Sequence, residues 1–223
     1  MDESAAIISL KEIYFTYPRG KQVLEGLDFN FPQNGRAGLV GPTGSGKTTL
    51  VHIIMGLLKP DSGRVEIFGS RREKESDFRD VRARIGFLFQ DADDQLFCPT
   101  VAEDVAFGPL NLGVPKSEVR KLVKDTLGQL ELDGFENRVT YKLSGGEKRL
   151  VSLATVLAMK PEMLLMDEPT TGLDDKTMER LVHLLLKSNL PYLIISHDNE
   201  FLKQTTNRIY RMNKGTILDQ VRG

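Results

Sequence analysis

The chain has 223 residues, of which 40% are hydrophobic and 27% charged, with a formal net charge of −1. This size fits one domain, or one domain with an inserted subdomain, and the balanced charge gives no indication of nucleic acid as a partner. Three histidines and one cysteine, Cys98, exclude a disulfide framework and a Cys/His zinc cluster. The acidic residues 1–4 are unlike a secretory signal, and no apolar run approaches the ~20 residues that span a bilayer.

The first ninety residues predict strands around one glycine-rich loop. Strands are expected at 7–15, 23–31, 36–40, 64–68 and 84–89, with a helix at 47–57 after the loop. The middle of the chain is helical, because the capping box Thr100–Glu103 opens a helix and further helices are expected at 115–130 and 145–159.

From residue 162 the pattern returns to alternation of strands and helices. A strand at 163–166, a helix at 175–187, a strand at 192–196 and a hairpin at 209–218 are expected. This alternation predicts a mostly parallel sheet, with an α/β core at 1–90 and 161–223 and an inserted helical subdomain at 91–160.

The glycine-rich loop at 41–48 matches the pattern G-x-x-x-x-G-K-[ST] between a predicted strand and a predicted helix. Glycines let the backbone N–H groups approach phosphates, Lys47 adds a positive charge, and the Thr48 hydroxyl can ligate Mg²⁺. The alternative is a glycine-rich turn of no chemical function. The predicted nucleotide-binding residues here are Gly41, Pro42, Thr43, Gly44, Ser45, Gly46, Lys47, Thr48 and Thr49.

An apolar strand ends in two acids, Asp167 and Glu168. Ligands of open α/β sheets bind at the carboxyl ends of the strands, so Asp167 is expected to hold Mg²⁺ and Glu168 to accept a proton from the attacking water. An acidic turn after a strand is the alternative interpretation.

Ser144 and Glu147 form a second predicted capping box, with Gly145 and Gly146 in the first turn of the helix. Glycines cost helix stability, so their presence here indicates that another group approaches the backbone. A second phosphate-seeking helix terminus predicts ATP shared between two subunits in a head-to-tail dimer.

The order of these motifs resembles that of the ABC ATPase family over essentially the whole chain. The resemblance implies a single ABC ATPase domain, 1–223, with the α/β fold of the P-loop NTPases, an antiparallel N-terminal β portion and an inserted helical subdomain. It also implies that Tyr17 stacks on adenine, Gln90 senses Mg²⁺ and the lytic water, and His197 contacts the γ-phosphate. Asp174 is then expected at the dimer seam, and residues 144–147 at the nucleotide of the other subunit.

Each of these residues has a simpler interpretation. Tyr17 fits a packed turn, Gln90 a loop cap, and Asp174 the N-cap of the following helix. His197 lies in Ser-His-Asp, but no G-x-S-x-G elbow accompanies it, so a nucleophile triad is rejected.

Within the family, the stretch from Phe87 to Leu110 is similar to the ATPases of energy-coupling-factor importers, in particular the cobalt/nickel branch. This resemblance implies a peripheral protein at the cytoplasmic face of the membrane, using ATP and Mg²⁺, in a homodimer or in a heterodimer with a related ATPase. The expected partners are a transmembrane coupling subunit and a substrate-binding membrane subunit. Nucleic acid is not expected as a partner. Alternatives are a vitamin importer such as one for biotin, another ABC importer or exporter, and a soluble ABC ATPase acting on nucleic acid. The chain ends at Gly223, soon after the last hairpin, whereas many members of the family carry a C-terminal extension that helps them dimerise. Dimerisation without ATP is therefore not expected.

Overall fold

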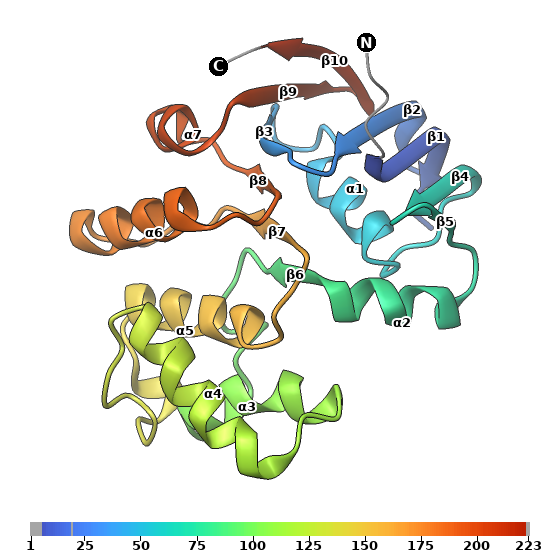
Figure 1. Ribbon diagram of the computed structural model, residues 1–223. Helices are drawn as coiled ribbons and strands as arrows, with labels where there is room; N and C mark the ends of the chain where they lie inside the picture. The colour runs from blue at the N-terminus through green and yellow to red at the C-terminus, as the bar shows by residue number, and fades with distance from the viewer. Residues whose placement is uncertain (1–5, 19, 222–223) are drawn as a thin grey trace. The chain divides into compact units, whose positions relative to one another are not determined.

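The computed structural model describes residues 6–18 and 20–221, and these divide between two compact units (Figure 1). One unit combines 1–82 with 190–223, and the other comprises 83–189. The acidic N-terminus, residues 1–4, lies outside the described residues. The subdomain boundaries predicted at 90 and 160 differ from these divisions and remain a prediction.

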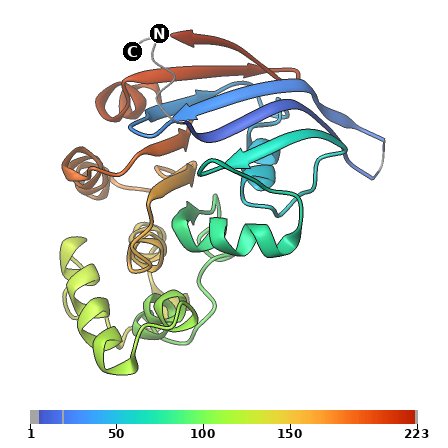
Figure 2. The ribbon, with the colours of Figure 1, turned by 45° about the vertical axis from the view of Figure 1, so that its right-hand side comes forward.

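The first unit begins with an antiparallel sheet. Strand β1 (Ala6–Thr16) pairs with β2 (Gln22–Pro32) on one side and with β4 (Ser62–Ile67) on the other, and β5 (Ser70–Arg71) follows β4. The long strands β1 and β2 lie side by side in Figure 2. Their inward residues alternate with exposed ones, as period-2 patterning requires. The expected antiparallel N-terminal portion is confirmed.

A parallel arrangement surrounds β3 (Arg36–Val40) in the same unit. This strand lies between β8 (Tyr192–Ile195) and β9 (Arg208–Asn213) and is parallel to both. The strand β10 (Thr216–Val221) turns back on β9 as the predicted hairpin. The helices of this unit are α1 (Lys47–Ile54), α7 (Asn199–Thr205) and most of α2 (Glu75–Arg84).

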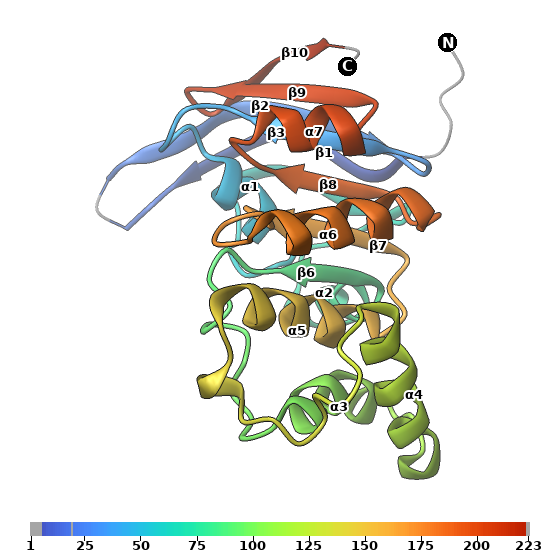
Figure 3. The same ribbon diagram turned by 90° about the vertical axis from the view of Figure 1, so that its left-hand side faces the viewer.

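The second unit has two parallel strands and a helical portion. The strands are β6 (Ile85–Leu88) and β7 (Met163–Asp167), all of whose residues are buried. Its helical elements are α3 (Val101–Asn111), α4 (Lys116–Gln129), the short η1 (Thr140–Lys142), α5 (Gly145–Leu157) and α6 (Asp175–Lys187). Helix α5 contacts α3, α4 and β6 (Figure 3).

Both predicted capping boxes are present. Thr100 caps α3 with Glu103, and Ser144 caps α5 with Glu147. Each box satisfies N–H groups that a helix N-terminus otherwise leaves unpaired. Within the described part of the chain, no helix combines the length and apolarity that crossing a membrane requires.

Candidate functional site

The glycine-rich loop joins the carboxyl end of β3 to α1, and its glycines are required by close approach and by backbone conformation. A Cβ added to Gly41 would lie 2.2 Å from the Met212 carbonyl oxygen. Gly46, directly before α1, has φ 109°, and Gly44 has φ 79°. The left-handed conformation strains any residue with a side chain, so glycine is needed to wrap this loop.

Two polar side chains are buried within the loop. The Lys47 ammonium donates to the carbonyl oxygens of Gly41, at 2.7 Å, and of Pro42, at 3.2 Å. The Ser45 hydroxyl is buried and has no hydrogen-bond partner within the chain. A buried hydroxyl without a partner is uncommon, and here it lies beside a helix N-terminus and a cation. The loop therefore has the chemistry of a phosphate site.

Tyr17 lies in the turn after β1 and is attached to α1. Its hydroxyl is 3.1 Å from the Thr49 hydroxyl, and its ring meets Phe15 edge-to-face at 4.9 Å. The side chain is nevertheless 37% exposed, so one part of the ring is packed and another is accessible. Both interpretations of Tyr17, packed turn and stacking platform, agree with this position.

His197 is an exposed residue, separated from the end of β8 by Ser196. Its neighbours are occupied with the backbone, since the Ser196 hydroxyl accepts the Asp198 N–H at 3.1 Å and the Asp198 carboxylate caps α7 at the Phe201 N–H. Their roles in the turn agree with the rejection of a Ser-His-Asp triad.

The second unit carries the two acids of β7. Asp167 is the last residue of the strand and only 3% exposed, while Glu168 follows it with a left-handed φ of 46°. A carboxylate this deeply buried needs compensating positive charge. The magnesium-binding role of Asp167 and the role of Glu168 as a base stay predictions.

Gln90 follows β6 in the same unit, and its side chain is exposed. Its carbonyl oxygen accepts a hydrogen bond at 2.5 Å from Arg149 of α5, a residue that the sequence interpretation missed. Arg149 is 4% exposed, also donates to the Glu168 carbonyl oxygen at 3.1 Å, and so joins the backbones of two predicted site residues. The available signal was its helical spacing, because positions 149, 150 and 153 fall on the buried face of α5.

At the N-terminus of α5, Ser144 and Gly145 are exposed and Gly146 is half-buried. A Cβ on Gly145 would meet nothing of the chain closer than 3.9 Å, and one on Gly146 nothing closer than 3.6 Å. The fold itself therefore does not require these two glycines. Glu147 accepts from the Ser144 N–H at 2.8 Å, and this bond, assisted by the pairing of Glu147 with Arg138, holds the pKa of the carboxyl below its usual value.

Asp174 is the N-cap of α6. Its side chain accepts the Thr177 N–H at 2.7 Å, and the hydrogen bonds from Thr177 lower the pKa of the carboxyl. The predicted capping role is therefore present, while the predicted place at a dimer seam stays a prediction.

Thr48 in the first unit, and Gln90 and Asp167 in the second, remain the predicted magnesium ligands. No group of three or more His, Cys, Asp or Glu side chains among the described residues could hold a metal ion by itself. Magnesium does not need such a cage, because it is bound in phosphate-transfer sites through one or two protein oxygens together with phosphate oxygens and water. One buried carboxylate, one hydroxyl and one amide fit that pattern.

Residues 24–171 match the family model described as ABC transporter. The chain belongs to the ABC transporter family. A putative ABC transporter ATP-binding protein of Nitratidesulfovibrio vulgaris is 50% identical over 95% of this chain and 78% of its own length. The energy-coupling factor transporter ATP-binding protein EcfA of Methanothermobacter thermautotrophicus is 42% identical over 95% of this chain and 70% of its own.

Solved ABC cassettes have the same fold. The cbiO1 protein of Clostridium perfringens, described as part of the ABC transporter complex cbiONQ, superposes with a TM-score of 0.85 at 32% identity, over 97% of this chain and 88% of its own. A dimeric cassette in a post-hydrolysis state with ADP and Pi superposes with a TM-score of 0.89 at 29% identity, over 96% of this chain and 98% of its own. The predicted ABC ATPase fold, the ATPase activity and the resemblance to energy-coupling-factor ATPases are confirmed.

Proposed function

We propose that this ABC ATPase energises an energy-coupling-factor importer, as a peripheral subunit at the cytoplasmic face of the cell membrane. The observation that carries the proposal is the 42% identity to EcfA proteins of two methanogens, Methanothermobacter thermautotrophicus and Methanocaldococcus jannaschii. That identity extends over at least 95% of the chain. The aligned region therefore includes the stretch from Phe87 to Leu110, on which the resemblance to this group of importers rests.

The nucleotide is bound by the glycine-rich loop and by Tyr17. Backbone N–H groups of the loop and the buried Lys47 ammonium neutralise the phosphates, and the Ser45 hydroxyl gains a partner. Tyr17 supplies the exposed part of its ring to the adenine, and His197 contacts the γ-phosphate.

Hydrolysis depends on Glu168, which accepts the proton of the attacking water while Gln90 orients that water. Thr48, Gln90 and Asp167 would hold Mg²⁺, and the ion would supply positive charge opposite the phosphate oxygens. The contribution of the protein is positioning and electrostatics rather than covalent chemistry.

A complete site requires a second cassette, identical or related. Gly145 and Gly146 leave the N-terminus of α5 open to an external group, and a helix N-terminus favours phosphate. Residues 144–147 of one subunit therefore contact the γ-phosphate held by the other, with Asp174 at the seam. The solved dimeric cassettes support this arrangement.

The membrane partners dock on the segment from Asp91 to Pro109, through an exposed aromatic pair. Phe97 is 65% exposed and Phe107 48%, and their rings meet edge-to-face at 4.8 Å. Exposed apolar side chains that cluster in this way are typical of protein interaction sites. The partners are a helical coupling subunit and a solute-binding membrane protein, and the solute is Ni²⁺ or Co²⁺.

Purification from membranes tests the assembly. The double variant Phe97→Glu, Phe107→Glu should keep nucleotide binding and lose the co-purifying membrane subunits. The control is Tyr141→Glu, which changes an aromatic residue that is 74% exposed and lies outside this segment. If the Glu variants still bring down the membrane subunits, docking at this pair is wrong.

Uptake measurements test the cargo. Cells without the gene should lose high-affinity nickel or cobalt uptake and regain it from a plasmid with intact Glu168, but not from one with Glu168→Gln. If biotin or another vitamin is lost instead, the importer remains and the metal cargo is wrong. If uptake of every small solute is normal, the importer assignment is wrong as well.

A further inference from the structure

Arg149 is a buried cation on α5, in the second unit. Its guanidinium donates to three backbone carbonyl oxygens, those of Phe89 and Gln90, both at 2.5 Å, and that of Glu168, at 3.1 Å. The first two acceptors belong to the segment after β6, and the third to the segment after β7. One side chain of α5 therefore joins the two adjacent strand ends from which Gln90 and Glu168 project.

The guanidinium is suited to this position by its shape and its charge. Burial lowers the pKa of Arg149, and the carboxylates of Asp91, Asp167 and Glu168 oppose that effect. Arginine keeps its proton in proteins, so Arg149 provides a permanent positive charge near these acids. Its five donors have a fixed planar arrangement, which lets one group satisfy acceptors on two different segments, whereas a lysine ammonium is a single point of charge.

The Glu168 backbone needs such support. Its φ of 46° lies in the left-handed region, which costs a residue with a side chain free energy unless the surroundings hold it. The bond from Arg149 to the Glu168 carbonyl fixes the peptide that follows this residue. This bond therefore restrains the backbone from which the Glu168 side chain projects.

The segment after β6 is attached to α5 a second time. The Gln95 side chain accepts the Phe89 N–H at 3.2 Å and donates to the Ser152 carbonyl oxygen and the Thr155 hydroxyl, both at 2.9 Å. The start and the end of this segment are thus both bound to α5, the helix that Ser144 caps. Gln90 is therefore held in a fixed relation to α5.

We propose that Arg149 is a positioning residue for hydrolysis, which places Gln90 and Glu168 in the mutual geometry that the attack of water requires. It does so through their backbones and does not itself touch the nucleotide. The inference rests on the roles proposed above for Gln90 and Glu168. Displacing reacting groups by about 1 Å can cost on the order of 10²-fold in rate, so loss of this arrangement should appear in kcat.

The test is the variant Arg149→Lys, which keeps the buried positive charge and removes the planar set of hydrogen-bond donors. We expect kcat for ATP to fall about 10- to 100-fold in the purified full chain. The Kd and the stoichiometry of a fluorescent ATP analogue should not change, because the proposed role of Arg149 is to position Gln90 and Glu168 and not to bind the nucleotide. Arg149→Gln, which keeps two donors without the charge, is the second variant, with the same expected split between kcat and Kd.

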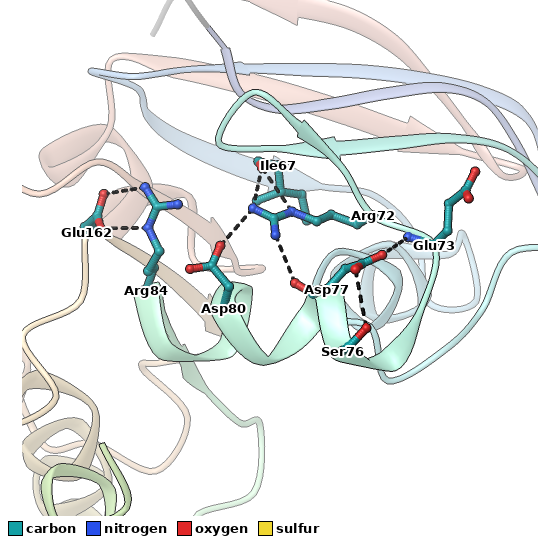
Figure 4. A network of polar contacts seen from close by, with 8 residues as sticks. All are labelled: Ile67, Arg72, Glu73, Ser76, Asp77, Asp80, Arg84 and Glu162. Atoms are coloured by element: carbon teal, nitrogen blue, oxygen red, sulfur yellow. Dashed lines mark hydrogen bonds and ion pairs between the residues drawn. The ribbon is translucent and has the colours of Figure 1, made fainter. Parts of the chain in front are cut away.

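Arg84→Lys is the matched control. Arg84 makes a bidentate ion pair with Glu162 at 2.7 and 2.9 Å (Figure 4). These two residues directly precede β6 and β7, whereas Arg149 binds residues that follow the two strands. The same replacement of Arg84 should leave kcat within twofold of the wild type.

Three outcomes would overturn the inference. One is wild-type kcat in a folded Arg149 variant, and another is a loss of kcat in proportion to a loss of nucleotide-binding stoichiometry, which would mean unfolding. The third comes from Glu168→Gln measured in parallel: if it turns over ATP at the wild-type rate, the proposed function fails and this inference with it. An inactive Glu168→Gln beside a fully active Arg149→Lys removes only the role of Arg149.

Discussion

The hydroxyl oxygens of Tyr17 and Thr49 lie 3.1 Å apart, and this contact joins the turn after β1 to the first turn of α1. Thr49 is thereby engaged with Tyr17, although the sequence assigned it to the nucleotide. The contact places the tyrosine ring beside the helix that follows the glycine-rich loop. The ring and the hydroxyl of Tyr17 therefore have different functions. The ring is available for stacking, and the hydroxyl fixes where the ring stands.

Tyr17→Ala should weaken binding of ATP and of GTP alike, by about 1–3 kcal/mol, because stacking on an aromatic ring reads no base edge. Tyr17→Phe keeps the ring and removes the bond to Thr49, so its nucleotide affinity should remain near that of the wild type. Displacement of a fluorescent nucleotide measures both variants. An unchanged affinity in Tyr17→Ala would return Tyr17 to the role of a packed turn residue.

Glu168→Gln should bind ATP normally and lose turnover by 10²–10⁴-fold, because an amide accepts no proton from the attacking water. Phosphate release from the purified chain measures the loss. Glu162→Gln is the control, since Glu162 directly precedes β7 and pairs with Arg84, at the other end of the strand that leads to Glu168. If Glu168→Gln hydrolyses ATP as fast as Glu162→Gln does, Glu168 is not the base.

Cys98 should be a slow nucleophile. Burial, with the neighbouring Asp104 carboxylate, raises the pKa of the thiol to about 11, so roughly a thousandth of it is thiolate at pH 8. Cys98 is the one cysteine of the chain, and a single alkylation rate is therefore measured. With iodoacetamide this rate should rise about tenfold per pH unit beyond pH 9, where the rate of an ordinary thiol levels off.

The raised pKa of Cys98 also determines how the stability of the folded state depends on pH. The folded state keeps its proton where the unfolded thiol, with a pKa near 8.5, has lost it, so this contribution to stability is complete below about pH 8.5 and lost as pH rises through about 11. Asp104→Asn keeps an acceptor for the Cys98 N–H, at 2.9 Å from Asp104, and should move the alkylation profile to lower pH. A wild-type profile that levels off near pH 8.5 would contradict the raised pKa.

Much of the fold could be predicted from the sequence because periodicity and capping act locally. The bounds of α6 (Asp175–Lys187) were predicted to the residue, since Asp174 caps the helix and its apolar residues follow one face. Helix α1 ends at Ile54, earlier than the predicted residue 57, because Gly56 takes a left-handed φ of 68°. A Cβ at Gly56 would collide with Phe78, which belongs to α2. Phe78 is too far along the chain for a local sequence pattern to predict this contact.

Helix α2 (Glu75–Arg84) was not predicted, because its ten residues bury only Phe78 and Val81. Its stability comes from tertiary contacts, in which Arg72 donates to the carbonyl oxygens of Ile67 and Asp77 and pairs with Asp80 (Figure 4). Arg149 was missed for the same reason. A charged residue on a helix is ordinarily solvated, and only the fold shows that this one is buried among carbonyl groups.

The last prediction concerns the open N-terminus of α5. If Ser144 and its two following glycines receive the γ-phosphate of a second subunit, ATP should drive Glu168→Gln into a dimer, because the nucleotide is bound but not consumed. Ser144→Arg added to that variant should restore the monomer, since a long side chain then occupies the approach that Gly145 and Gly146 leave open. Sizing chromatography with saturating ATP separates the two states.

A control for the lost cap is available in the same unit. Thr100→Arg, in the Glu168→Gln background, removes an equivalent capping box from α3 and should cost similar stability, about 0.5–2 kcal/mol, without affecting association. Both caps hold a helix N-terminus, but only that of α5 carries two glycines that the fold does not need. A dimer with Thr100→Arg and a monomer with Ser144→Arg would therefore attribute association to the approach of phosphate rather than to helix stability. A dimer with both variants, or a Glu168→Gln monomer at saturating ATP, would contradict the shared site.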